Sequence, residues 1–129
     1  MDTDKLQIYV DCFQLQKLLY TAQFGICKKD RIVMGNRLLD TNAKLFAHIA
    51  MANNCKEERL KYIEMFISDF ETLKMYLRIS VEESLIEKDS LKSGIFEYVS
   101  KIDKGIYSWR SYTLARQADA PNKRASQSD

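Results

Sequence analysis

The sequence is short of the residues that make turns. Its 129 residues include four glycines and one proline, whereas average usage would give about nine and about six. Sandwiches, barrels and dinucleotide-binding folds need many tight connections, so this scarcity argues against them. Because the single proline is Pro121, no proline breaks a helix before that position. The composition therefore predicts long helices.

Long apolar runs and a cysteine framework are also absent. No stretch of about 18 uncharged apolar residues exists, which predicts no membrane span, and residues 1–5 lack the basic start of a signal peptide. The three cysteines, Cys12, Cys27 and Cys55, are odd in number and form no CxxC pair. This pattern predicts a cytoplasmic protein without structural disulfides. The net charge of +2 is too small to indicate a nucleic-acid partner by itself.

Apolar residues recur at helical spacing along most of the chain. Helices with short connections are expected over residues 4–22, 31–52, 56–83 and 88–116. This order predicts an all-α fold, an antiparallel up-down-up-down four-helix bundle, as one domain over residues 1–116. Residues 117–129 are small and polar, and predict a disordered tail.

Three local features accompany these helices. Asp30 is expected to cap the second helix at its start. Asn53 and Asn54 are expected to end it in a left-handed conformation. Gly105 lies inside the fourth helix, where glycine costs roughly 1 kcal/mol against alanine, so a close approach of a neighbouring helix is expected there.

The second helix carries apolar residues on more than one side. Its apolar set is Ile32, Met34, Leu38, Leu39, Ala43, Leu45, Phe46, Ile49, Ala50 and Met51. A bundle core uses one face of each helix, so the remaining apolar positions need another partner. We therefore expect a homo-oligomer.

Catalytic motifs are missing. His48 is the only histidine, and no Glu-x-x-His pair, zinc spacing or glycine-rich phosphate loop is present. His48 is expected to be a surface or boundary residue of its helix. The sequence thus predicts no catalytic residue, no metal site and no cofactor, and a protein that is not an enzyme.

Lys74 interrupts the apolar seam of the third helix. Written as heptads, one core position holds Leu60, Ile67, Lys74 and Val81. Arg78 lies one turn further on the same face. In one interpretation Lys74 extends out of the seam or pairs with Glu71 or Asp69. In the other, Lys74 and Arg78 line a positive surface for phosphates.

Further basic residues follow in the fourth helix. Lys101 and Lys104 are one turn apart and fit either a solvated face or phosphate contacts. The preceding residues 55–87 are acidic overall, with five Lys/Arg against eight Asp/Glu and a net charge of −3. That acidity motivates an alternative function, a structural or protein-binding module without nucleic-acid binding.

The order of elements and three short segments resemble a known family. The segments are Ile26-Cys27-Lys28-Lys29, Leu73-Lys74-Met75-Tyr76-Leu77-Arg78 and Ile102-Asp103-Lys104-Gly105-Ile106-Tyr107-Ser108-Trp109. Over about residues 6–114 the chain resembles the accessory variability determinant of diversity-generating retroelements. That family is related to the four-helix intervening-sequence proteins of ribosomal RNA.

The resemblance implies a specific function. Such proteins are four-helix bundles that assemble as homopentamers and bind both nucleic acid and the retroelement's reverse transcriptase. They support copying of a template RNA into the cDNA that diversifies a target gene. Lys74 and Arg78 fall on the family's two basic positions in the third helix, so both are expected to contact RNA or DNA phosphates, assisted by Lys101 and Lys104.

Overall fold

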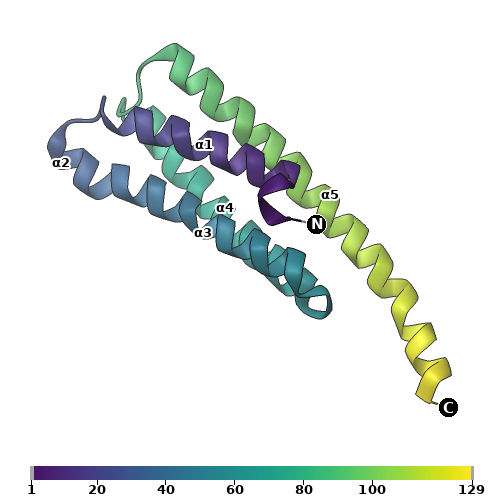
Figure 1. Cartoon of the computed structure of the whole chain (residues 1–129). Coiled ribbons are helices and arrows are strands. Elements are labelled where there is room, and N and C mark those ends of the chain that lie inside the picture. Colours follow the sequence, from purple (N-terminus) through teal and green to yellow (C-terminus); the bar gives the residue numbers. More distant parts are fainter. Residues whose placement is uncertain (1, 129) are drawn as a thin grey trace.

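The computed structural model describes the backbone of residues 2–128 and the side chains of residues 2–119. Within this range four long helices dominate (Figure 1), which are α1 (Gln7–Gln23), α3 (Asn36–Asn54), α4 (Arg59–Glu82) and α5 (Asp89–Ser128). Short helical turns precede three of them, namely η1 (Thr3–Lys5) before α1, α2 (Lys28–Asp30) with η2 (Arg31–Gly35) before α3, and η3 (Lys56–Glu58) before α4.

Consecutive long helices run in opposite directions and pack side by side. α1 lies against α3 and α5, and α4 also lies against α3 and α5, so α1 and α4 occupy diagonal corners of the bundle. The prediction of an all-α antiparallel four-helix bundle is confirmed. The predicted disordered tail, residues 117–129, falls mainly on residues 120–129, which lie outside the described side chains.

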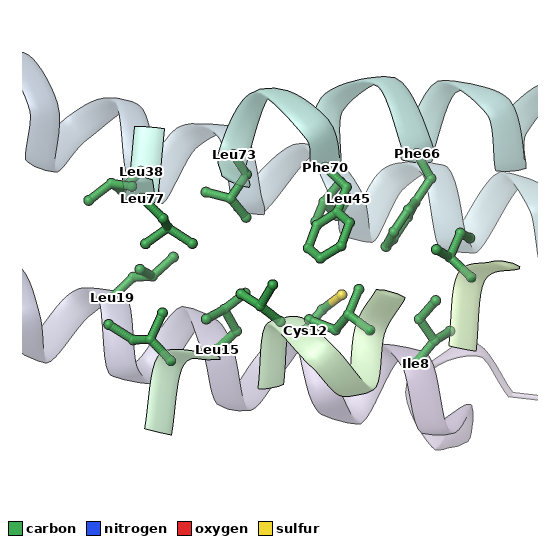
Figure 2. Packing of buried hydrophobic residues seen from close by; sticks show 14 of the residues in the cluster. Ile8, Cys12, Leu15, Leu19, Leu38, Leu45, Phe66, Phe70, Leu73 and Leu77 are labelled. Atoms are coloured by element: carbon green, nitrogen blue, oxygen red, sulfur yellow. The ribbon is translucent and has the colours of Figure 1, made fainter. Parts of the chain in front are cut away.

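A single apolar core joins the four helices. Figure 2 shows Phe66, Phe70 and Leu73 of α4 facing Cys12 and Leu15 of α1. Each of these five side chains is at most 1% exposed. Burying a side chain such as leucine or phenylalanine stabilises the fold by roughly 1.5–3 kcal/mol, so this layer accounts for much of the bundle's stability.

Cys12 belongs to the core, and its thiol is not accessible to solvent. Burial raises the pKa of the Cys12 thiol well above its usual range, and the negative charge of Asp11 raises it further. The thiol therefore stays protonated and packs as a small apolar side chain. All three cysteines are free thiols in this structure.

The end of α3 differs from the sequence prediction. Asn53 and Asn54 are helical, and Cys55 follows with φ −114° and ψ 83°. Arg59 makes a left-handed stop unnecessary, because its Nε donates to the carbonyl of Ala52 at 2.7 Å and its Nη2 to that of Asn53 at 3.2 Å. The guanidinium thus satisfies carbonyls that a helix end leaves unpaired.

Among the described residues, the left-handed backbone conformation occurs at the end of α4 and not at the end of α3. Ser84 has φ 58°, and the next amide, that of Leu85, donates to the carbonyl of Ser80 at 2.8 Å. This is the bonding of a left-handed C-terminal cap. It turns the chain sharply from α4 into α5.

The start of the second helical region also differs. Helix begins at Lys28 after the extended Cys27, three residues before the predicted start. Asp30 is therefore inside the helix, where its carboxylate accepts a hydrogen bond from the Cys27 thiol at 3.2 Å. The five residues of η2 form a π-helical turn, which shifts the register before α3 begins.

Gly105 is not the position of closest approach in α5. A Cβ at Gly105 would lie 3.9 Å from Cδ1 of Ile8, an ordinary contact, whereas a Cβ at Gly94 would lie 3.3 Å from Cδ1 of Leu18. The expected tight contact is therefore at Gly94. Gly105 costs conformational entropy without a packing reason in the monomer.

We expect Gly105→Ala to raise the free energy of unfolding by about 0.5–1 kcal/mol, because alanine favours a helix interior and its methyl group fits here. Gly94→Ala is the matched control, and should gain less because Leu18 must move. Urea unfolding followed by circular dichroism measures both. A Gly105→Ala variant that is less stable than the parent would show that close packing does require glycine at this position.

Candidate nucleic-acid interface

Lys74 bridges two helices at the edge of the core. Its Nζ lies 2.7 Å from Oε1 of Glu71, one turn away on α4, and 3.1 Å from Oδ1 of Asp103 on α5. The ammonium is also 5.1 Å from the centre of the Phe70 ring. The Lys74 side chain is 28% exposed. The charge in the apolar seam is thus accommodated by two carboxylates and an aromatic face.

Of the two sequence-predicted partners, Glu71 is found and Asp69 is not. Asp69 instead binds His48 of α3, with 2.6 Å between Oδ2 and Nε2. This places the single histidine at the α3–α4 boundary, as expected, with its side chain 13% exposed. The sequence did not indicate Asp103 as a partner, because the residues of α4 and α5 that face each other depend on how the two helices pack.

Two opposing effects act on the pKa of Lys74. Burial lowers it, because desolvation disfavours the charged form, but hydrogen bonds and charge interactions with Glu71 and Asp103 outweigh that effect and raise the pKa above 10.5. Lys74 is therefore fully protonated at neutral pH. Its charge is matched locally by two carboxylates, so a phosphate approaching Lys74 would first meet negative charge.

Arg78 is much more accessible. Its side chain is 80% exposed, and its Nε lies 3.0 Å from Oε1 of Glu82, one turn further along α4. Exposed pairs of this kind contribute about 0.3–0.5 kcal/mol. The guanidinium of Arg78 can consequently exchange Glu82 for a phosphate at small cost.

Lys101 and Lys104 are both exposed on α5. The Nζ atom of Lys101 lies 3.3 Å from Oε1 of Glu97 and 4.8 Å from the centre of the Tyr98 ring. Among the side chains described, Lys104 has no ion-pair or hydrogen-bonding partner. Lys104 is therefore the cation of the four with the least competition from protein carboxylates.

The four predicted residues do not form one continuous patch. Asp103 turns toward α4, where it meets Lys74. Each residue advances a helix by about 100°, so Lys101, two positions before Asp103, lies on nearly the opposite side of α5. Lys104 lies about a quarter turn from Asp103. A ligand that contacts Arg78 and Lys101 together would have to pass around α5.

Other kinds of site find no support in the described part of the chain. No group of three or more His, Cys, Asp or Glu side chains there is arranged to hold a metal ion. None of the described helices combines the length and the hydropathy needed to cross a membrane.

Comparison with known proteins adds no relative, since no family model, no curated protein and no solved structure matches this chain.

We expect Lys74→Met to lower the free energy of unfolding by about 1 kcal/mol at pH 7, because it leaves Glu71 and Asp103 without their shared cation. The loss should stay constant up to the ordinary lysine pKa of 10.5. It should shrink above that pH, because the unfolded chain releases the lysine proton first, and vanish as the pH passes the raised pKa of the folded chain.

The measurement is urea unfolding of parent and variant between pH 7 and pH 11. Lys92→Met is the matched control, since Lys92 pairs with an Asp89 side chain that is 98% exposed, and it should cost less than about 0.5 kcal/mol. Equal losses in the free energy of unfolding of the two variants would mean that the Lys74 bridge stabilises the fold no more than an exposed ion pair does.

Proposed function

We propose that this chain is a non-enzymatic adaptor of a diversity-generating retroelement. It would bind nucleic acid and the retroelement's reverse transcriptase, and so support copying of the template RNA. The resemblance supplies the retroelement and the polymerase partner. The four-helix bundle is the fold that the resemblance implies, and it offers a rigid scaffold with long exposed faces.

The observation that carries nucleic-acid binding is the exposure of Arg78 and Lys104. Arg78 is 80% exposed, and Lys104 has no carboxylate partner among residues 2–119. Such cations attract phosphates regardless of sequence. In this proposal Arg78, Lys101 and Lys104 contact phosphates, whereas Lys74 positions α4 against α5 through Asp103 and makes no phosphate contact of its own.

A second candidate is a protein-binding module without nucleic-acid affinity. It is favoured by the ion pairs of Lys74 and Lys101, which bring carboxylates close to two of the four cations. The two functions differ in a measurable way. Phosphate binding weakens steeply as salt increases, and a protein-only module shows no such binding even at low salt.

The test is binding of a fluorescent single-stranded RNA at several salt concentrations. For the variant Arg78→Ala/Lys101→Ala/Lys104→Ala, we expect the magnitude of the log K against log salt slope to fall by about 2, at roughly 0.7 per lost contact. Lys74→Met should bind nearly as tightly as the parent. A control variant at three other exposed lysines, Lys44→Ala/Lys56→Ala/Lys88→Ala, removes the same charge elsewhere.

Equal losses in the triple variant and its control would reject the assigned residues. Absence of RNA binding by the parent at low salt would reject the nucleic-acid function and favour the protein-binding module.

A further inference from the structure

An apolar hollow lies between α5 and the start of α1. Leu6 and Ile8 line it from one side, and Gly105, Trp109 and Tyr112 line it from α5. Figure 1 shows the start of the chain beside α5, at the end of the bundle beyond which α5 continues. The volume of this hollow is about 400 Å³, which is within the range of pockets that bind small molecules.

Gly105 keeps the apolar hollow open. A Cβ at this position would have Cδ1 of Ile8 as its neighbour, at 3.9 Å, so packing within the chain does not require glycine here. Alanine or leucine would also favour the helix. Positions that break a local rule of this kind are expected at functional sites. A longer side chain would fill the hollow, so the glycine is what leaves room for a ligand.

A second, cationic hollow adjoins the first, because Tyr112 lines both. Its volume is about 390 Å³, and it lies between α5 and the turn that leads into α4. Its charged side chains are three cations and one carboxylate, namely Lys56, Arg59, Arg116 and Glu57. None of the three cations forms an ion pair with a side chain of residues 2–119. The excess of positive charge in a hollow favours an anion as its occupant.

Aromatic rings and hydrogen bonds hold the two arginines in place. The guanidinium carbon of Arg59 lies 5.9 Å from the centre of the Trp109 ring, and two carbonyls at the end of α3 accept hydrogen bonds from this guanidinium. Arg116 donates to the hydroxyl of Tyr112, and its guanidinium carbon lies 5.4 Å from the centre of that ring. Side chains that are already ordered lose less conformational entropy when a ligand binds.

We propose that the two hollows form one binding site for a small amphipathic anion. Such a molecule joins an apolar ring or short chain to a single carboxylate, sulfonate or phosphate group. The apolar part occupies the apolar hollow, against Trp109 and above Gly105. The anionic group lies on the other side of Tyr112, in the cationic hollow, where Arg116 and Lys56 bind it through charge-assisted hydrogen bonds.

This inference does not depend on the proposed function. The cations assigned to RNA, which are Arg78, Lys101 and Lys104, line neither hollow. Loss of RNA binding in the triple variant and loss of small-molecule binding at this site are therefore separate outcomes.

The test uses the fluorescence of Trp109, which is the single tryptophan of the chain and lines the apolar hollow. The probe is anilinonaphthalene sulfonate, a dye that carries one sulfonate on an apolar ring system. A dye bound beside Trp109 accepts its excitation energy and quenches its emission. We expect saturable quenching in the parent, with one dye bound per chain.

Two variants test the two parts of the site. Gly105→Leu fills the apolar hollow while favouring the helix, and should abolish dye binding. Arg116→Ala removes a cation from the cationic hollow, and should weaken dye binding at least roughly fivefold. Lys101→Ala is the matched control, because it removes a cation from the same helix outside both hollows, and it should bind the dye as the parent does. Circular dichroism checks that each variant is folded.

Displacement of the dye identifies the anionic group that the site prefers. Naphthyl phosphate, naphthalene sulfonate and naphthoate share a ring system and differ in the anion, so the concentrations at which they displace half of the dye rank the three groups. Inorganic phosphate has no apolar part and should not displace the dye at these concentrations. Equally effective displacement by inorganic phosphate would overturn the assignment of an amphipathic ligand.

Three further results would overturn the proposal. Absence of quenching in the parent would mean that the hollows bind no such molecule. Unchanged binding by Gly105→Leu would place the dye outside the apolar hollow. Unchanged binding by Arg116→Ala, or an equal loss in Lys101→Ala, would show that the cationic hollow does not hold the anionic group.

Discussion

The single apolar core at which side chains of all four helices meet is the feature on which the others depend. Phe66, Phe70 and Leu73 fill the space over Cys12 and Leu15, and α3 and α5 close the sides. Because these side chains are almost fully buried, the centre of the bundle is closely packed. The outer faces of the diagonal helices α1 and α4 lie on opposite sides of the molecule.

A few polar side chains determine how the helices are aligned on this core. Asn42 of α3 is fully buried, and its Nδ2 donates to the carbonyl of Cys12 and to Oε1 of Gln16, both on α1. Lys74 does the same at the other side by joining α4 to Asp103 of α5. Buried or half-buried polar contacts of this kind set register more than they add stability.

The Lys74 bridge changes how the basic residues of the chain are interpreted. A lysine in an apolar seam is compatible with ligand binding or with an internal ion pair, and the structure shows the ion pair. Of the four predicted residues, the accessible cations are Arg78, Lys101 and Lys104, and they are distributed around the bundle. Any polyanion bound by these residues would be held by dispersed contacts with its backbone.

Much of the fold followed from the sequence. The scarcity of glycine and proline, with apolar residues such as Ile8, Leu15 and Leu19 at helical spacing, was sufficient to predict the helices and their up-down order, because both are local properties of the chain. The pairing of Lys74 with Glu71 was also foreseeable, since residues three apart on a helix are neighbours. Helix ends were less predictable, because the carbonyls after Ala52 are satisfied by Arg59 from the next helix.

Other features were decided by tertiary structure. The choice of Asp103 as a partner of Lys74, of Asp69 as a partner of His48, and the separation of Lys101 from Arg78 all depend on which faces of α3, α4 and α5 meet. The sequence by itself determined that each helix has apolar residues to bury. Only the packing of four helices around one core decided which of those residues are covered and which, as on α1 and α4, remain at the surface, because a single core can accept only one face of each helix.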